Sequence, residues 1–279
     1  MQMTAGYAIM SASPPERTIT MCTAFIHKGH DVIFGFNMDL NADALVYNLY
    51  ATEDWFGVGC PADLRAFAGG QADVPAHYQV SDGIRRIHGV NRQGVFAACL
   101  NSMNATAAPF RLADDACSID QMTDDLLAGR RSLEEVCRFA DTVELTTLPP
   151  GAVDVPDPGF HVLSGDASGN ALLLEPGNGY AVLQGNYAVL TNFPLLQLPA
   201  DLSDKTASFY GKDRYDTALS MLRAAGDDFS PAQALNILQA TRQNGQWATR
   251  VSFVFSCREK TVYYCLEGDF DHIMTHRFP

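Results

Sequence analysis

Short apolar runs with turn residues between them recur along the chain from residue 22 onward. Many of these runs are rich in β-branched and aromatic residues, a composition typical of strands in a sheet. The first two flank a turn at Lys28-Gly29-His30 and therefore predict a β-hairpin. The pattern predicts strands at residues 23–27, 31–37, 84–90, 95–100, 160–165, 171–175, 180–184, 188–191, 247–256 and 261–266.

Apolar residues at helical spacing occur in two pairs of segments between these strands. Ser132 and Glu135 have the spacing of a capping box, and Ser230 followed by Pro231 is typical of a helix start. The predicted helices cover residues 118–128, 132–141, 215–224 and 231–240. A Pro- and Gly-rich stretch at residues 149–159 is interpreted as a long surface connection. This order of elements favours an α+β protein with helices stacked outside one or two antiparallel sheets.

Composition and charge exclude several classes of protein. The chain has 279 residues, 47% of them hydrophobic and 18% charged, which fits a folded protein with a sizeable core. A formal net charge of −13 argues against nucleic acid or an anionic membrane as partner, because both need a basic surface. No apolar run reaches the roughly 18 residues that a spanning helix needs. The seven cysteines contain no Cys-x-x-Cys pair, so neither a disulfide framework nor a zinc site is expected.

Residues 1–21 are interpreted as a leader in front of a single domain at residues 22–279. A breaker cluster at residues 11–15 gives the leader no periodicity, so we expect it to be flexible. It has no basic start, and its apolar run at residues 7–10 is too short for a secretory signal, so we expect a cytoplasmic protein. The alternative is that Met21 is the true start of the protein.

Cys22 stands apart from the other cysteines because it follows Met21 at the point where the strand pattern begins. Exposed as the first residue, it would carry an α-amine with a pKa near 8 and a thiol with a pKa of about 8.5. The amine could then act as general base for the thiol of its own residue. The alternative is a cysteine that packs in the core at the start of a strand, as the remaining cysteines are expected to do.

Five stretches carry a resemblance to a known family. They are Met21-Cys22-Thr23, residues 34–39, residues 89–95 leading to Leu100-Asn101, residues 161–175 and residues 189–192. Because these five stretches occur in the order and at the spacing of the family, the chain resembles the choloylglycine hydrolase family, which comprises the bile salt hydrolases and penicillin V acylases of the N-terminal-nucleophile hydrolase superfamily. It is also similar to the acyltransferases that act on 6-aminopenicillanic acid. The resemblance extends to about residue 266 and implies a four-layer αββα sandwich that needs no metal and no organic cofactor.

The resemblance assigns roles to five residues. Cys22 matches the nucleophile, Asp39 the carboxylate that orients its amine, and Asn192 the side-chain donor of the oxyanion hole. Asn101 matches the position that supplies a second donor from its backbone or side chain. Arg214 matches an arginine that stabilises charge near the nucleophile. Taken alone, the asparagines and the aspartate would also fit turns, and Arg214 would fit a solvated charge at a helix start.

The chain departs from the family in two places. Phe36 replaces an arginine of the family beside the nucleophile, which predicts a less stabilised thiolate and a more apolar pocket. The stretch between Asn192 and Arg214 is too short for the extension that bile salt hydrolases use to form tetramers. That tetramer is therefore not expected here, and a homo-oligomer of another kind stays open.

The expected activity is hydrolysis of a linear amide in a small-molecule N-acyl substrate, through an acyl-thioester on Cys22. Transfer of the acyl group to an amine or alcohol stays open. A non-catalytic role also stays open, because an internal Cys22 has no free amine. The residues Leu45, Tyr47, Leu49, Tyr50, Trp55 and Phe56 could line an apolar acyl pocket or pack in the core. Bile salts, penicillin V, N-acyl amino acids and acyl-homoserine lactones all fit this class.

Overall fold

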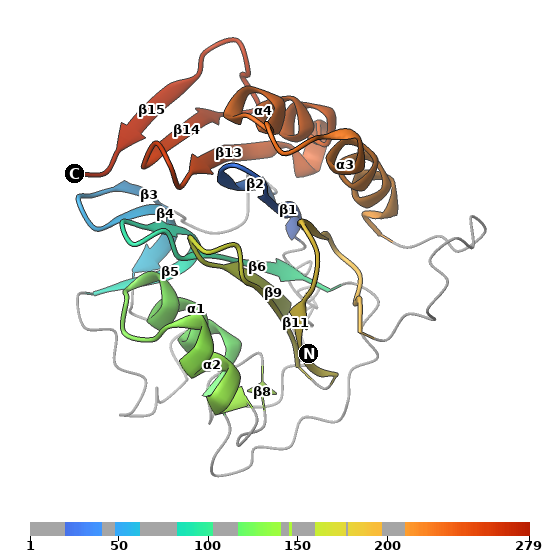
Figure 1. The fold of residues 1–279 in the computed structure, drawn as a ribbon. Helices are drawn as coiled ribbons and strands as arrows, with labels where there is room; N and C mark the ends of the chain where they lie inside the picture. The colour runs from blue at the N-terminus through green and yellow to red at the C-terminus, as the bar shows by residue number, and fades with distance from the viewer. Residues whose placement is uncertain are drawn as a thin grey trace, which may run out of the picture.

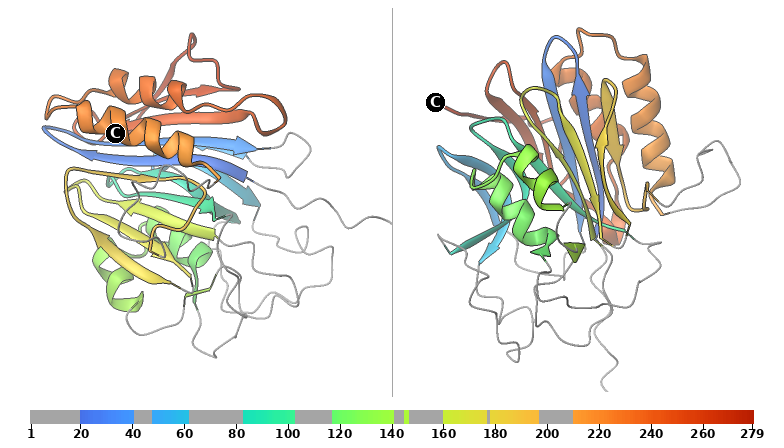
Figure 2. Two further views of the ribbon diagram at one scale, coloured as in Figure 1. Left: turned by 90° about the vertical axis from the view of Figure 1, so that its right-hand side faces the viewer. Right: turned by 60° about the horizontal axis from the view of Figure 1, so that its bottom comes forward.

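In the computed structural model of the chain, two β-sheets lie face to face and helices cover their outer sides (Figure 1). The structure describes residues 20–40, 48–61, 83–102, 117–140, 145–146, 160–176, 178–196 and 210–279. Seen edge-on, the layers run helix, sheet, sheet, helix (Figure 2). The four-layer αββα sandwich implied by the resemblance is therefore confirmed.

The first sheet has six strands in the order β12-β1-β2-β13-β14-β15, all antiparallel. Their bounds are β1 Thr20–Lys28, β2 Val32–Leu40, β12 Tyr187–Leu190, β13 Thr249–Ser256, β14 Thr261–Leu266 and β15 Met274–Arg277. The hairpin of β1 and β2 lies at the centre, and its register places Cys22 opposite Met38. Thr20 and Met21 continue β1 ahead of Cys22 and pair with Leu40 and Asp39.

The second sheet has seven antiparallel strands in the order β11-β10-β9-β6-β5-β4-β3. Their bounds are β3 Asn48–Ala51, β4 Trp55–Pro61, β5 Ile84–Asn91, β6 Phe96–Asn101, β9 Phe160–Gly165, β10 Ala171–Glu175 and β11 Gly179–Leu183. A separate short parallel pair joins β7 Cys117–Ser118 to β8 Leu145–Thr146.

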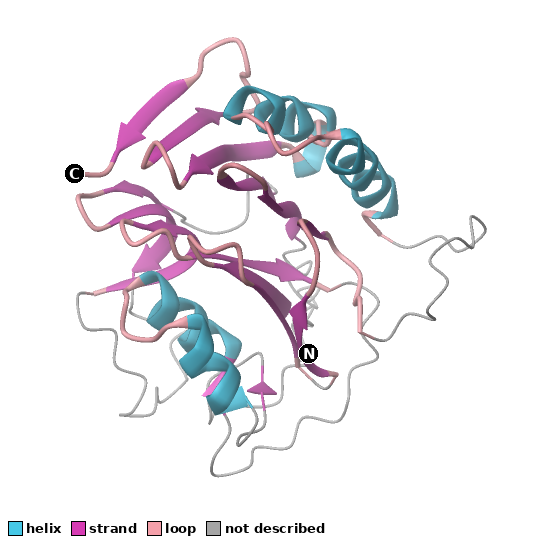
Figure 3. Ribbon diagram, in the orientation of Figure 1, coloured by secondary structure: helices cyan, strands magenta, loops and turns pink. Residues whose placement is uncertain are grey.

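The helices divide between the two outer faces (Figure 3). Their bounds are α1 Ile119–Leu127, α2 Leu133–Ala140, α3 Lys212–Ala224 and α4 Pro231–Ala240. The first two pack on the seven-stranded sheet and the last two on the six-stranded sheet. The predicted capping box between Ser132 and Glu135 is confirmed, and so is the helix start at Ser230 with Pro231 in the first turn. Gln233 completes a second capping box that was not predicted. None of the described helices is long and apolar enough to cross a membrane.

Alternation along β1 decides what each side chain can reach. Cys22, Ala24 and Ile26 point into the core between the two sheets. Phe25 points the opposite way, into the core beneath α3 and α4. Because successive strand residues face opposite sides, Thr23 lies on the helix side with Phe25. Around residue 22, β1 therefore presents one side chain to the space between the sheets and the next to the layer of helices.

Five of the described strands were missing from the prediction: β3, β4, β15 and the two-residue strands β7 and β8. Strand β4 contains Gly57 and Gly59, and glycine is depleted in strands. A side chain at Gly57 would overlap the carbonyl oxygen of His88 on the neighbouring strand. Glycine is therefore required there by close strand approach, rather than by a turn.

Candidate active site

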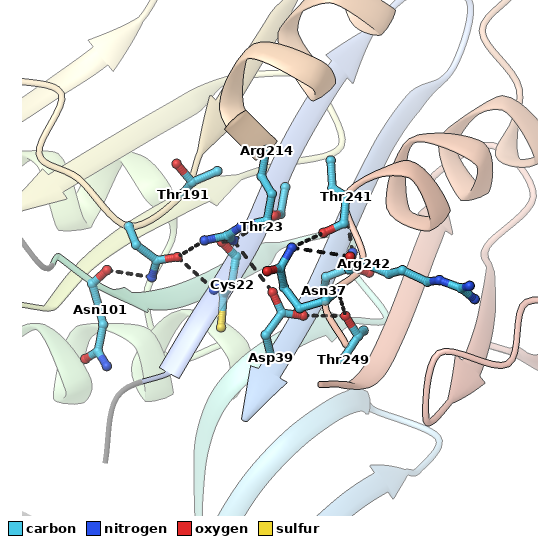
Figure 4. A network of polar contacts seen from close by, with 12 residues as sticks. Cys22, Thr23, Asn37, Asp39, Asn101, Thr191, Arg214, Thr241, Arg242 and Thr249 are labelled. Carbon is cyan, nitrogen blue, oxygen red and sulfur yellow. Dashed lines mark hydrogen bonds and ion pairs between the residues drawn. The ribbon is translucent and has the colours of Figure 1, made fainter. Parts of the chain in front are cut away.

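The five residues assigned by the resemblance lie on five different elements or their ends. Cys22 is on β1, Asp39 on β2, Asn101 at the end of β6, Asn192 just after β12, and Arg214 in the first turn of α3. Contacts between them are all buried, and Figure 4 shows them as one connected network. The structure thus brings together residues that are up to about two hundred positions apart in the sequence.

Cys22 is fully buried, and its backbone N–H donates a hydrogen bond to Asn192 Oδ1 at 3.0 Å. That nitrogen belongs to the peptide bond with Met21, so it is an amide in the full chain. Burial raises the pKa of the Cys22 thiol, and the nearby Asp39 carboxyl raises it further. A backbone hydrogen bond from Asp39 and the Arg214 charge act in the opposite direction. The thiol is therefore neutral at neutral pH in this form of the chain.

Asp39 is fully buried on the helix side of β2. Burial raises its pKa to about 7, while the charge of Arg214 and a hydrogen bond from Thr249 oppose that rise. Thr249 Oγ1 donates to Asp39 Oδ1 at 2.5 Å and itself accepts from the backbone N–H of Gln243 at 2.8 Å. Asp39 Oδ2 makes no hydrogen bond within the described part of the chain and lies 3.6 Å from Arg214 Nη1. One carboxylate oxygen is thus held and the other is left for a further donor.

Arg214 is buried, with 3% of its surface exposed, so it is not a solvated charge at a helix start. Its Nη1 donates to the carbonyl oxygen of Cys22 and, at 3.1 Å, to Thr23 Oγ1. Its Nη2 donates to Asn192 Oδ1 at 2.7 Å. The guanidinium therefore connects the backbone of Cys22, the side chain of Asn192 and Asp39.

Gly211 makes room for this guanidinium at the start of α3. It caps the helix with φ of +82°, a conformation that favours glycine. A Cβ there would lie 2.7 Å from Arg214 Nη2 and 3.1 Å from Thr191 Cβ. Gly211 was not among the residues singled out from the sequence, and neither was Thr249. A glycine just before a predicted helix is a signal for the first, whereas no local pattern marks the second.

Asn192 is the hub of the cluster. Its Oδ1 accepts from Cys22 N–H and from Arg214, which fixes the orientation of its amide. Its Nδ2 donates to the backbone carbonyl oxygen of Asn101 at 2.8 Å. Asn101 therefore enters the cluster through an acceptor, and its side chain points away from that contact in Figure 4. Its role as a second oxyanion donor stays a prediction.

Phe36 faces the core between the sheets, on the same side of the six-stranded sheet as Cys22. Its ring centroid lies 4.5 Å from that of His88 and 5.4 Å from that of Phe253. Burial lowers the pKa of His88 to about 3, so this histidine is neutral. The position of the family's arginine is thus occupied by an uncharged aromatic cluster.

The described residues among those considered for an acyl pocket divide between two of the hydrophobic cores. Trp55 is buried in the core on the helix-covered face of the seven-stranded sheet, which fits the packing alternative. Tyr50 packs against the same core, whereas Phe56 and Leu49 pack between the sheets. Leu45 and Tyr47 lie outside the described residues. Within the described ranges, no group of three or more His, Cys, Asp or Glu could hold a metal ion.

The four layers, with the buried Cys22 near the start of a central strand, are the arrangement that the resemblance implies. Among solved structures, the chain is similar to a mutant of conjugated bile acid hydrolase from Clostridium perfringens, with a TM-score of 0.60 and 15% identity over 91% of this chain and 92% of that one. A second variant of that enzyme from Clostridium perfringens has a TM-score of 0.58 and 16% identity, over 91% of this chain and 92% of that one. Penicillin V acylase from Agrobacterium tumefaciens has a TM-score of 0.51 and 15% identity, over 88% of this chain and 83% of that one.

At these identities the likeness concerns the fold, and it agrees with the resemblance carried by the five sequence stretches. No protein-family model matches the sequence, and no curated protein sequence matches it significantly. The roles of individual residues therefore depend on the geometry of the site itself.

Proposed function

We propose that the protein is an amide hydrolase that uses Cys22, freed as the first residue of the chain, as its nucleophile. The observation that carries the proposal is the buried network in which Asn192 contacts the Cys22 nitrogen, Arg214 and Asn101 at once. Its fold is shared with enzymes named as a conjugated bile acid hydrolase and a penicillin V acylase. The proposed substrate is a linear amide of an N-acyl small molecule.

In the proposed reaction the sulfur of Cys22 attacks the amide carbonyl carbon, and the thiol proton passes to the free α-amine. The oxyanion that forms is stabilised by the Nδ2 donor of Asn192, which the contacts to Arg214 and Cys22 hold in orientation. The ammonium then gives its proton to the leaving nitrogen, and the C–N bond breaks. Water, deprotonated by the amine, hydrolyses the thioester and releases the acid.

Asp39 serves the amine in this scheme. Its Oδ2 lacks a hydrogen-bond donor among the described residues, and a cationic ammonium on Cys22 would supply one. A buried carboxylate oxygen without a hydrogen-bond donor is costly, so the ammonium would stabilise Asp39 as Asp39 stabilises the ammonium. The hydrogen bond from Thr249 to Oδ1 fixes the rotation of the carboxylate and thereby aims Oδ2.

The proposal requires Cys22 to become the first residue. Either translation starts at Met21 and this methionine is removed, or the Met21–Cys22 bond of the longer chain is cleaved. Self-cleavage is the route we favour. The Cys22 sulfur attacks the Met21 carbonyl, the peptide nitrogen leaves as the free amine, and water hydrolyses the resulting thioester. Arg214, which donates to the Cys22 carbonyl, would hold the nucleophile's backbone in place while the leader departs.

The first test is the intact mass and N-terminal sequence of the expressed protein. A chain that starts at Cys22 is then assayed for acid release from penicillin V, a glycine-conjugated bile acid and a panel of N-acyl anilides. Cys22→Ala should abolish release, whereas Cys265→Ala, the same change at another buried cysteine, should not. If an added amine is acylated and no acid is released, the activity is that of an acyltransferase rather than a hydrolase. A folded protein that keeps residues 1–21 and releases no acid would contradict the proposal.

A further inference from the structure

Two buried ionisable residues outside the cluster lie on either side of the turn that carries Asn192. His161 on β9 and Glu175 on β10 are at most 1% exposed. Their hydrogen-bond partners include backbone groups that flank Asn192 on both sides, at Thr191 and at residues 195–196. The proposed mechanism uses neither side chain, so their purpose needs a separate explanation.

The contacts of His161 determine where its hydrogens lie. Its Nε2 is 2.8 Å from the carbonyl oxygen of Thr191, and because a carbonyl only accepts, Nε2 is the donor. Its Nδ1 is 3.4 Å from Glu175 Oε1, so the two side chains are partners within the same buried contact. His161 therefore connects Glu175 to the residue directly before Asn192.

Glu175 fixes the other side of the same turn. Its Oε1 accepts from the backbone N–H of Leu195 at 2.6 Å, and its Oε2 accepts from that of Leu196 at 2.8 Å. A buried carboxylate is tolerated only when its oxygens are hydrogen-bonded, and here the backbone of this turn supplies donors to both. The two side chains thus hold the backbone at both ends of a segment of about six residues.

Burial of the His161–Glu175 pair is by itself weak support for a role in stability. Replacing a buried ion pair by apolar residues of similar volume is often neutral or stabilising. What the pair does supply is direction, because hydrogen bonds fix the position and the rotation of the peptide groups that they hold. The side chain so oriented is Asn192, which must aim its Nδ2 at a reacting oxygen.

We propose that His161 and Glu175 are positioning residues for the oxyanion donor Asn192. The inference rests on the proposed function, since an oxyanion donor has meaning only in acyl transfer. A misplacement of about 1 Å can cost as much as 100-fold in rate. Losing the clamp should therefore lower kcat by about 10- to 100-fold and leave KM unchanged, because the interaction is made in the transition state.

The test uses the full chain with its N-terminus determined, and the variants Glu175→Gln, His161→Phe and His161→Gln. Glutamine at 175 places an amide N–H opposite a backbone N–H, whereas glutamine at 161 keeps a donor for the Thr191 carbonyl. The control is Asp31→Asn. Asp31 is also a buried carboxylate that accepts from a backbone N–H, that of Arg258, but it lies in the turn at the opposite end of the β1–β2 hairpin. Six strand residues separate that end from Cys22, about 20 Å.

Four quantities are measured for each variant: kcat and KM on the amide that the unmodified protein cleaves fastest, the melting temperature, and the rate of Cys22 alkylation by iodoacetamide. Alkylation needs the thiol but no oxyanion donor. We expect kcat to fall much further in Glu175→Gln and His161→Phe than in the control Asp31→Asn. His161→Gln should have a kcat between those of His161→Phe and the unmodified protein. The rate of Cys22 alkylation should be the same in all variants. Equal kcat in Glu175→Gln and Asp31→Asn, or a parallel fall in alkylation, would overturn the inference. If the unmodified protein starts at Cys22 and cleaves no amide, the proposed function itself has failed, before any variant is compared.

Discussion

The stability of the unprocessed chain should depend on the protonation of Asp39. This carboxyl is buried beside Arg214 and Thr249, and its pKa in the folded chain is raised to about 7. In an unfolded chain the same group has a pKa of about 3.9. Between these two values the folded chain binds a proton that the unfolded chain has released.

The sign of the effect follows from this difference. The free energy of unfolding falls with rising pH wherever the folded state binds more protons. The stabilising contribution is therefore complete below pH 4 and is lost as the pH rises to the folded-state value. Each pH unit between pH 5 and the folded-state pKa of about 7 lowers the free energy of unfolding by about 1.36 kcal/mol, so the total decrease is about 3 kcal/mol.

The assay is urea denaturation at pH 5 and pH 8, carried out on a Cys22→Ala background so that residues 1–21 stay attached. Asp39→Asn on that background removes the titrating group and should flatten the pH dependence by about 3 kcal/mol. Thr249→Val should steepen it, because losing a hydrogen bond to the carboxylate raises the pKa of Asp39 further. Parallel curves for the Asp39→Asn variant and its parent would refute the reasoning.

Three further changes test other parts of the structure. Asn192→Ala should lower kcat on the best amide by about 100- to 1000-fold, measured against unchanged Cys22 alkylation. Gly211→Ala should destabilise the protein by about 1–2 kcal/mol from its left-handed backbone alone, and should also lower kcat by displacing Arg214. Phe253→Ala removes a fully buried ring between the sheets and should lower the free energy of unfolding by about 3–5 kcal/mol in urea denaturation.

The parts of the fold that local chemistry determines could be predicted from the sequence. The β1–β2 hairpin follows from two strand-forming runs around a glycine turn, and α4 follows from Ser230, Pro231 and an apolar face. Strand β15 could not be predicted, because Met274–Arg277 is short and forms by pairing with β14. Strand formation there depends on a partner rather than on propensity.

The site divides in the same way. The residue types Cys22, Asp39 and Asn192 could be found by resemblance, because each stands in a recognisable stretch. The contact from Thr249 to Asp39 joins residues 210 positions apart, and no spacing in the sequence indicates it. His161 lay inside a matching stretch, yet its hydrogen bond to the Thr191 carbonyl depends on how β9 lies beside the end of β12. Contacts between strands that are distant in the sequence, within one sheet or between the two sheets, are set by the assembled fold. Local sequence patterns do not encode them.

Charge couples the processing of the chain to its chemistry. Before cleavage, the Cys22 nitrogen is a neutral amide bonded to Asn192, and Asp39 forms an ion pair with Arg214. Freeing the amine would place a second positive charge near Oδ2, which has no hydrogen-bond donor among the described residues, and would lower the pKa of Asp39, since an opposite charge favours the carboxylate. The carboxylate would then hold the ammonium, and Arg214 would be released to balance charge on the thiol and the oxyanion. Under the proposed function, cleavage therefore changes the ionisation of the site as well as exposing its nucleophile, and the uncleaved chain is inactive for two separate reasons.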